Sequence, residues 1–313
     1  MMYARPKILP AVLLAAILGI SVSGPLARLA QAEPLAIAVW RLSLALGVIA
    51  VMLLATGAWR EWRTLSQRDL LVASGAGVLL AVHLWSWIAS LGMTTVAASV
   101  VLVNLHPVVI VAGSALWLGE RPTRGQLIGL GLALIGAMVI GLGDALMARG
   151  VVDAALATGE VAGNSAMGNA LALLGAFTVG LYYLAGRSLR QRLSLWPYVG
   201  LVYGACLGAL LIFAFASGTR LTGFAAREWL LFGGIALGPM LLGHTGFNWS
   251  LRHVPAYVVS LALLAEPVGA TVLAYLLPGI HETPSMPVLI GGVIVLLGLG
   301  VGSMAPREPA AGE

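Results

Sequence analysis

Long apolar stretches recur along the whole chain, and short polar connections separate them. A helix needs about 20 apolar residues to cross the roughly 30 Å hydrocarbon core of a bilayer. Ten stretches meet this length, and we expect each to form one membrane-spanning helix. Their approximate ranges are 8–30, 34–56, 70–91, 95–118, 125–146, 167–187, 196–217, 229–251, 255–276 and 285–305. The pattern predicts an all-α polytopic membrane protein that leaves no room for a soluble catalytic domain.

The composition excludes the soluble and the disordered classes. Hydrophobic residues make up 60% of the 313 residues, and charged residues make up only 9%. Soluble domains carry about 25% charged residues, and disorder requires low hydrophobicity with high charge. Cys206 is the only cysteine, so neither an intrachain disulfide nor a cysteine-based metal cluster can form.

The basic residues orient the bundle. With both termini in the cytoplasm, twelve Lys and Arg residues fall on the inner side and five on the outer side. The inner set is Arg5, Lys7, Arg60, Arg63, Arg68, Arg121, Arg124, Arg187, Arg190, Arg192, Arg252 and Arg307, and the outer set is Arg28, Arg41, Arg149, Arg220 and Arg227. Positive charge accumulates on the cytoplasmic side of membrane proteins, so we expect a multi-pass protein of the cell inner membrane. The net charge of +5 then reflects orientation, and we expect no nucleic-acid partner. Arg41 should snorkel outward from the start of the second span.

Two halves of the chain carry similar polar markers in the same order. The first has His83, Ser99, His106-Pro107 and Glu120, and the second has His244, Ser260, Glu266-Pro267 and Glu282, at a nearly constant offset of 160 to 162 residues. Each half contains five predicted helices, and an odd number makes two similar halves enter the membrane from opposite sides. Inverted repeats of this kind occur in transporters that alternate access about a midplane site. We expect a first repeat at 8–146, an external connection at 147–166 and a second repeat at 167–305.

The sequence resembles a known superfamily over about residues 8–305. The two five-helix halves, the proline in the fourth helix of each half and the segment Leu118-Gly119-Glu120 resemble the drug/metabolite transporters with paired EamA domains. Tyr257–Pro267 and the third helix, rich in His and Trp, resemble the YddG-type aromatic amino acid exporters. The resemblance implies export of small molecules from the cytoplasm. The second half lacks the Leu-Gly-Glu segment, so the sequence does not fix the residue at which the ninth helix ends.

Two ionisable residues fall near the middle of their spans. His106 and Glu266 occupy matching places in the two halves, and each precedes a proline, Pro107 or Pro267, that should kink its helix. Ionisable residues inside a bilayer are costly and mark functional sites. We therefore expect a substrate site here. The structural alternative is that His106 and Glu266 pair and brace the bundle.

A second polar set lies on the third and eighth helices. His83 and Trp87 are four residues apart, as are His244 and Asn248, so each pair shares one helix face. We expect His83 and His244 on opposite sides of a V-shaped central cavity that is open to one side. Further polar or aromatic candidates bring the predicted substrate-binding set to His83, Trp87, Ser99, Asn104, His106, Tyr182, Tyr183, Tyr203, His244, Asn248, Tyr257 and Glu266. Ser23 should face Tyr182 and Tyr183.

Glycines predict close helix contacts. They recur four residues apart at Gly125 and Gly129, at Gly298 and Gly302, and at Gly200, Gly204 and Gly208. Small residues at this spacing let membrane helices approach closely. We expect the fifth and tenth helices to be peripheral. Thr123 and Ser285 should cap the starts of these two helices.

The polar residues favour a carrier over an enzyme. The sequence has no His-Glu-x-x-His motif and no recognisable set of metal ligands, so we expect no catalytic residue, metal or cofactor. Aromatic rings, imidazoles, an amide and one carboxylate favour amino acids, aromatic ones included. Phosphorylated substrates are disfavoured because no internal Arg or Lys pair is evident. A carrier for other metabolites or drugs and a channel-like facilitator remain the alternatives. The expected partners are a small-molecule substrate and the lipid bilayer, and we expect a monomer.

Overall fold

The structure, a computed structural model of the chain, describes residues 6–93, 99, 102–147, 165–276 and 286–304, and every regular element in this part is helical. The first half contains α1 (Leu9–Ser21), α2 (Ser23–Leu29), α3 (Pro34–Thr56), η1 (Ala58–Thr64), α4 (Gln67–Ser90), α6 (His106–Gly113), η2 (Ser114–Leu118) and α7 (Arg124–Met147). The second contains α9 (Ser165–Arg190), α10 (Leu195–Ser217), α11 (Ala226–Ile235), η3 (Ala236–His244), α12 (Thr245–Ser250), α13 (Ala256–Leu263), α14 (Glu266–Leu276) and α15 (Met286–Met304).

Six helices in the described part are long and apolar enough to cross a membrane: Leu9–Ala27, Pro34–Thr56, Gln67–Ser90, Met167–Arg190, Leu195–Ser217 and Ala226–Ser250. Shorter apolar helices occupy the positions of the other expected spans, at His106–Leu118, Arg124–Val139, Ala256–Ala270 and Leu289–Gly302. The all-helical membrane class is confirmed, whereas the number of ten spans stays a prediction. Most of the expected connection at 147–166 and the end of the ninth helix lie outside the described residues.

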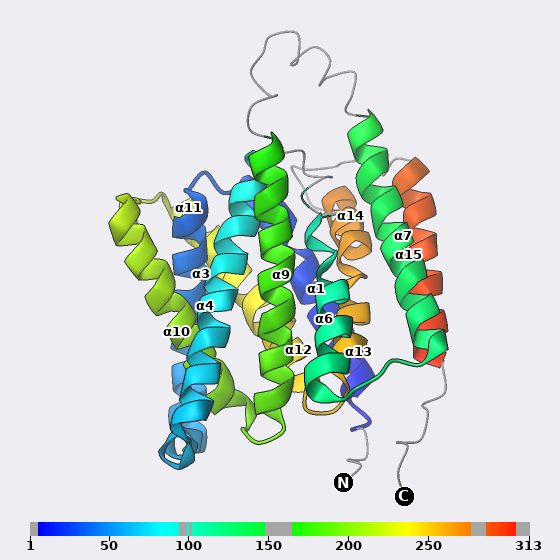
Figure 1. The fold of residues 1–313 in the computed structure, drawn as a ribbon. Coiled ribbons are helices and arrows are strands. Elements are labelled where there is room, and N and C mark those ends of the chain that lie inside the picture. The colour runs from blue at the N-terminus through cyan, green and yellow to red at the C-terminus, as the bar shows by residue number, and fades with distance from the viewer. Residues whose placement is uncertain (1–5, 94–98, 100–101, 148–164, 277–285, 305–313) are drawn as a thin grey trace, which may run out of the picture.

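The two halves run in opposite directions. Helix α1 begins at the end of the bundle where α15 finishes, while α9 runs toward that end (Figure 1). We call this end the terminal end and the opposite one the far end. Helix α1 packs on η3, α12 and α14, and its counterpart α9 packs on α4 and α6. Exchanging the halves therefore maps one set of contacts onto the other, in agreement with an inverted repeat. The α7–α15 pair lies at the edge of the bundle, as predicted (Figure 1).

Each predicted kink is a short interruption of the helix. Helix α6 begins at His106 with Pro107 in its first turn, and α14 begins at Glu266, directly before Pro267. The two residues ahead of each start form a turn. Proline lacks a backbone N–H and fits the first turn of a helix, where that donor is not used. Both ionisable residues are consequently held at the starts of half-helices.

Glycine brings the backbones of α7 and α15 into contact. A Cβ atom at Gly129 would lie 2.6 Å from the carbonyl oxygen of Gly298. In lipid the association of helices depends on such close van der Waals packing, since no hydrophobic force drives it. The same prediction was wrong for Gly204 and Gly208, whose Cβ positions have nothing within 4 Å. The α10 surface at Gly204 is exposed and faces away from the other helices.

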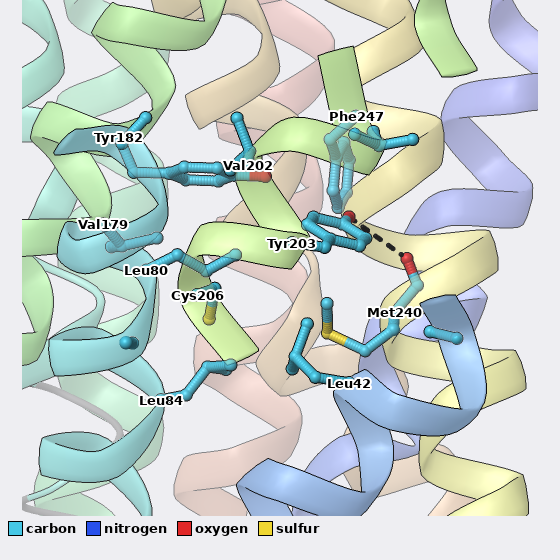
Figure 2. Close-up of a cluster of buried hydrophobic side chains, with 14 of the residues drawn as sticks. Leu42, Leu80, Leu84, Val179, Tyr182, Val202, Tyr203, Cys206, Met240 and Phe247 are labelled. Atoms are coloured by element: carbon cyan, nitrogen blue, oxygen red, sulfur yellow. Dashed lines mark hydrogen bonds between the residues drawn. The ribbon is translucent and has the colours of Figure 1, made fainter. Parts of the chain in front are cut away.

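The central core forms where helices of both halves meet. Leu42, Leu84, Cys206 and Met240 converge there from α3, α4, α10 and η3 (Figure 2). The hydroxyl of Tyr203 donates to the carbonyl oxygen of Met240 over 3.5 Å, the dashed line in Figure 2. Tyr203 is fully buried in this core. The core fixes the positions of α3 and α4, which both contribute to the site described below.

The contact between α4 and α10 gives a test of this packing. A Cβ atom at Gly77 would lie 2.5 Å from the carbonyl oxygen of Val202, so Gly77→Ala forces the two helices apart. Overpacking of this kind costs about 1–3 kcal/mol. We expect the variant to lower the thermal unfolding midpoint of the detergent-solubilised protein, measured by size-exclusion chromatography after heating. Gly204→Ala is the matched control and should not lower it. Equal midpoints for the two variants would contradict the close contact between α4 and α10.

Candidate functional site

A pocket of about 50 Å³ lies in the centre of the bundle, between elements of both halves. Seven of the predicted site residues line it: His83, Trp87, Asn104, His106, Tyr183, His244 and Glu266. Ser23 and Arg41 complete its polar lining. The structure thus brings the central candidates from α4, α6, α9, η3 and α14 together. That they bind a substrate stays a prediction.

The pocket is much smaller than the expected V-shaped cavity. Ligand pockets usually enclose about 300–1,000 Å³, so a volume of about 50 Å³ corresponds to a contracted state. The bulky side chains of Leu84, Trp87 and Tyr183 are part of its lining. The expectation of an open cavity was therefore wrong for this structure.

The two pseudo-symmetric histidines lie side by side, which corrects their expected placement on opposite sides of the cavity. The ring centroids of His83 and His244 are 6.3 Å apart. The ring of Trp87 lies nearly parallel to that of His83 at 6.5 Å, as their four-residue spacing predicts. The hydroxyl of Tyr183 lies 3.3 Å from Nδ1 of His244. His244 ends the π-helical segment η3, which contains Pro239, and such widened turns are frequent at functional sites.

Four predicted site residues lie behind the pocket and support its walls. The Asn248 amide donates to the hydroxyl of Tyr182 and, over 2.7 Å, to the carbonyl oxygen of His244. Tyr203 lies 3.1 Å from the hydroxyl of Thr245 in the core. Ser99 pairs with Ser90, with 2.6 Å between their hydroxyl oxygens. The expectation that Tyr182, Tyr203, Ser99 and Asn248 line the pocket is not met in this structure, and that they bind a substrate stays a prediction.

Tyr257 lines a different pocket. That pocket has a volume of about 10 Å³ and lies among α6, α7, α13 and α15, next to Gln126 and Leu261. The position of Tyr257 near the start of the ninth span places it toward the α7–α15 pair. Trp85 likewise packs edge-on against Phe213, with ring centroids 4.9 Å apart. Neither ring contributes to the central pocket.

Backbone carbonyls orient two histidines. Nδ1 of His83 lies 2.9 Å from the carbonyl oxygen of Gly175, and Nδ1 of His106 lies 3.1 Å from that of Val103. A carbonyl only accepts, so Nδ1 carries the proton of the neutral ring and Nε2 is left as an acceptor. Nε2 of His106 is buried without a hydrogen-bond partner. No hydrogen bond joins His106 to Glu266 in the described part of the chain, so the bracing pair is not formed there.

Arg41 is the site residue that sequence reasoning missed. Its side chain is 1% exposed and lines the pocket, and its Nε and Nη2 atoms have no hydrogen-bond partner. The expectation that Arg41 snorkels outward was wrong, because it lies seven residues after Pro34, the start of α3. Seven residues of helix place it about 10 Å below that start. The available signal was that Arg41 is the only ionisable residue between 34 and 56.

The pocket presents both donors and acceptors. The guanidinium of Arg41 and the indole N–H of Trp87 are donors, and the Trp87 Nε1 atom is buried without a partner. The carboxyl group of Glu266 and Nε2 of His106 are acceptors in the same lining. No group of three or more potential metal ligands occurs among the residues that the structure describes. The donors and acceptors of the lining can form hydrogen bonds with a small polar molecule.

The comparisons with known proteins agree with this architecture. The model of the EamA-like transporter family matches residues 7–142 and 166–303. The chain belongs to the EamA-like transporter family. The predicted membership of the drug/metabolite transporter superfamily is thereby confirmed, and the chain is a multi-pass membrane protein of a transporter family. No curated protein matches it.

A solved structure shares the fold of this EamA-like protein. It is described only as the crystal structure of a protein and superposes with a TM-score of 0.74 at 18% sequence identity. The alignment covers 96% of this chain and 98% of the other. At this identity the likeness shows the fold alone.

Polar contacts hold the two EamA-like halves together at the terminal end. Glu120 accepts a hydrogen bond from Nε of Arg187 over 2.7 Å, and the same arginine donates to the carbonyl oxygen of Leu251. Glu120 therefore pairs across the two halves. The predicted cap is confirmed at Thr123, which exchanges hydrogen bonds with Gln126. Its counterpart Ser285 lies outside the described residues.

Further contacts at the terminal end join the same two halves. Ser194 donates to Glu61 through its backbone N–H over 3.0 Å and through its hydroxyl. The indole N–H of Trp62 donates to the carbonyl oxygen of Pro197 over 3.0 Å. These bonds link η1 of the first half to the start of α10 in the second.

A separate set of contacts holds the far end. The carboxylate of Glu228 accepts the backbone N–H groups of Gln31 and Ala32 at 3.1 and 3.3 Å. The indole N–H of Trp40 donates to the carbonyl oxygen of Leu221 over 2.9 Å, and its ring packs on Trp229. In this structure the halves are therefore in contact on both sides of the pocket.

The separation of Tyr183 from Tyr257 gives a testable prediction. Tyr183→Ala removes a ring from the central pocket, whereas Tyr257→Ala removes the same ring outside it. We expect Tyr183→Ala to lower substrate uptake about tenfold or more, since one lost contact of about 1.4 kcal/mol corresponds to tenfold. Uptake should be measured in proteoliposomes and normalised to folded protein. A larger loss for Tyr257→Ala would show that the central pocket is not the site.

Proposed function

We propose that this EamA-like protein is a carrier that exports amino acids, aromatic ones included, across the inner membrane by alternating access. The observation that carries the proposal is a buried pocket at the interface of two inverted halves that holds one basic and one acidic side chain. Arg41 and Glu266 contribute these groups from different halves of the chain. Midplane sites between inverted repeats are where carriers bind their substrates.

The charges favour amino acids over other metabolites. An arginine inside the membrane is costly, up to about 2.5–3.5 kcal/mol at the helix centre on insertion scales, so keeping Arg41 buried in α3 calls for a ligand that uses it. Among the described residues, Arg41 is the only arginine or lysine that lines the central pocket. Phosphate groups are usually bound by forks of several cations, whereas one cation and one carboxylate suit a zwitterion. Trp87 and Tyr183 add aromatic surface for an apolar side chain. The pocket must widen to admit such a ligand.

The contacts at the two ends support alternating access. Substrate can reach the pocket only when the halves separate at one end, and the opposite contacts must then stay closed. The terminal end carries Glu120–Arg187 and Glu61–Ser194, and the far end carries Glu228 with the backbone of Gln31. Each set is polar and modest in strength, as reversible contacts must be.

The charge distribution supports cytoplasmic termini. The connections η1, between α3 and α4, and 119–123, before α7, lie at the terminal end (Figure 1) and carry Arg60, Arg63 and Arg121. The connection from α10 to the start of α11 lies at the far end and carries Arg220 and Arg227. Burial and the neighbouring arginines lower the pKa of His253, in the turn after α12, and so disfavour its charged form. The excess of Lys and Arg at the terminal end is typical of a cytoplasmic face. The export direction rests on the resemblance to the exporters.

A counterflow experiment tests the function. Proteoliposomes loaded with unlabelled L-phenylalanine should transiently accumulate labelled L-phenylalanine from outside, because a carrier exchanges substrate at one site. Empty liposomes and liposomes loaded with glucose 6-phosphate are the controls and should show no accumulation. Uptake without counterflow would favour the channel alternative. Failure of all twenty amino acids to exchange would contradict the proposed substrate class.

The alternation itself can be tested with spin labels. In a Cys206→Ala background, one label pair at Arg63 and Arg252 reports on the terminal end, and one at Glu33 and Arg220 reports on the far end. Glu120→Gln weakens the ion pair with Arg187 and should lengthen only the terminal-end distance. Glu228→Gln loses the charge that holds two backbone N–H groups and should lengthen only the far-end distance. Lengthening of both distances in one variant would argue against alternating access.

A further inference from the structure

The two ionisable side chains of opposite type in the central pocket, Arg41 and Glu266, lie on different walls. The donors Arg41 and Trp87 come from α3 and α4, and the acceptors His106 and Glu266 come from α6 and α14. Helix α3 packs on α4, while α6 packs on α13, which leads directly into α14. The two groups of helices lie on either side of α9 (Figure 1). The pocket is therefore polarised, with a cationic wall and an acidic wall.

The two opposite charges do not neutralise each other directly. In the described part of the chain no ion pair of 4.0 Å or less joins Arg41 to Glu266. The Nε and Nη2 atoms of Arg41 and the Nε1 atom of Trp87 are buried and lack hydrogen-bond partners. Buried donors without partners are rare in folded proteins and cost about 1–3 kcal/mol each. Their position around one pocket indicates that a ligand supplies the missing partners.

We infer that the pocket recognises the two charged groups of an α-amino acid: Arg41, together with the Trp87 N–H, binds the carboxylate, and Glu266, together with Nε2 of His106, binds the ammonium group. This assignment deepens the proposed function and rests on it. It names the residues that select the substrate class. The carrier function by itself does not identify these residues.

The chemistry of each wall matches its half of the ligand. The planar guanidinium presents its N–H groups as a fork that fits a carboxylate with two parallel hydrogen bonds. An ammonium group has three donors and no acceptor, so it needs a carboxylate and a further acceptor such as a bare imidazole nitrogen. The carbonyl oxygen of Val103 holds the His106 ring in that acceptor state. Leu84, Val179 and Leu263 supply apolar surface for the side chain of the ligand.

This geometry predicts a strong requirement for both charges. A ligand that lacks one of them leaves Arg41 or Glu266 buried without its counterpart, and sites built for hydrogen bonding reject such analogues steeply. The probes are L-phenylalanine, phenethylamine, which lacks the carboxylate, and 3-phenylpropionate, which lacks the ammonium group. We expect the purified protein to bind L-phenylalanine at least tenfold more tightly than either analogue in calorimetric titrations.

Two variants assign each charge to its residue. Arg41→Gln should weaken the binding of L-phenylalanine at least tenfold. It should leave the affinity for phenethylamine unchanged, because that analogue has no carboxylate for Arg41 to bind. Glu266→Gln should weaken the binding of L-phenylalanine to the same extent and leave the affinity for 3-phenylpropionate unchanged. Arg41→Lys, which keeps the charge without the fork, should restore part of the affinity. Ligands and variants together form a cycle that isolates each pairwise contact.

Arg190 is the matched control for a buried arginine. It is 1% exposed, and its guanidinium donates to the carbonyl oxygens of Asn248 and Leu193. Arg190→Gln should lower the thermal unfolding midpoint of the ligand-free protein while keeping the preference for L-phenylalanine over phenethylamine. Arg41→Gln should leave that midpoint unchanged or raise it, because its Nε and Nη2 atoms have no partners to lose.

The outcomes separate the inference from the proposed function. The assignment is overturned if the wild-type protein does not bind L-phenylalanine more tightly than both analogues. It is also overturned if Arg41→Gln weakens the binding of phenethylamine as much as that of L-phenylalanine. If Arg41→Gln lowers the thermal unfolding midpoint and keeps the ligand preference, the role of Arg41 is structural and the assignment is overturned as well. Binding is measured without transport, so a protein that shows the predicted preference but no counterflow supports the assignment and refutes the carrier function.

Discussion

The arrangement of this protein depends on the burial of opposite charges in a bundle that is otherwise apolar. Arg41 and Glu266 come from different halves of the chain and face one small pocket without forming a close ion pair in the part of the chain that the structure describes. Lipid offers no partner for such groups, so they must face the interior of the bundle. The surrounding helices therefore have to pack tightly enough to exclude lipid and still separate enough to admit a ligand.

The fold meets these two demands with different residues. Glycines such as Gly77 and Gly129 bring neighbouring backbones into contact and make the packed interfaces of α4 with α10 and of α7 with α15. Prolines lie where one apolar half-helix gives way to the next, so that His106 and Glu266 begin new helices beside the pocket. Discontinuous helices at mid-depth are how many transporters build their binding sites. Polar contacts between the halves are placed at the two ends, where a small movement can break them.

Much of the fold could be predicted from the sequence because length and hydrophobicity identify membrane helices. The repeat followed from polar markers at a nearly constant offset, and those same markers placed His83, His106, His244 and Glu266 at the pocket. The polar markers do not show in which direction each side chain points. Arg41 has no counterpart marker in the second half and was assigned to the membrane surface by its nearness to the start of a span. Tyr257 and Asn248 share residue types with pocket residues, yet helix rotation turns them toward other partners.

The most direct test of the central claim is an experimental structure determined with saturating L-phenylalanine. We expect ligand density between α3 and α14, with the carboxylate at the guanidinium of Arg41, the ammonium group at Glu266 and a pocket widened well beyond about 50 Å³. Density elsewhere in the bundle, or a ligand bound in the reverse orientation, would contradict it.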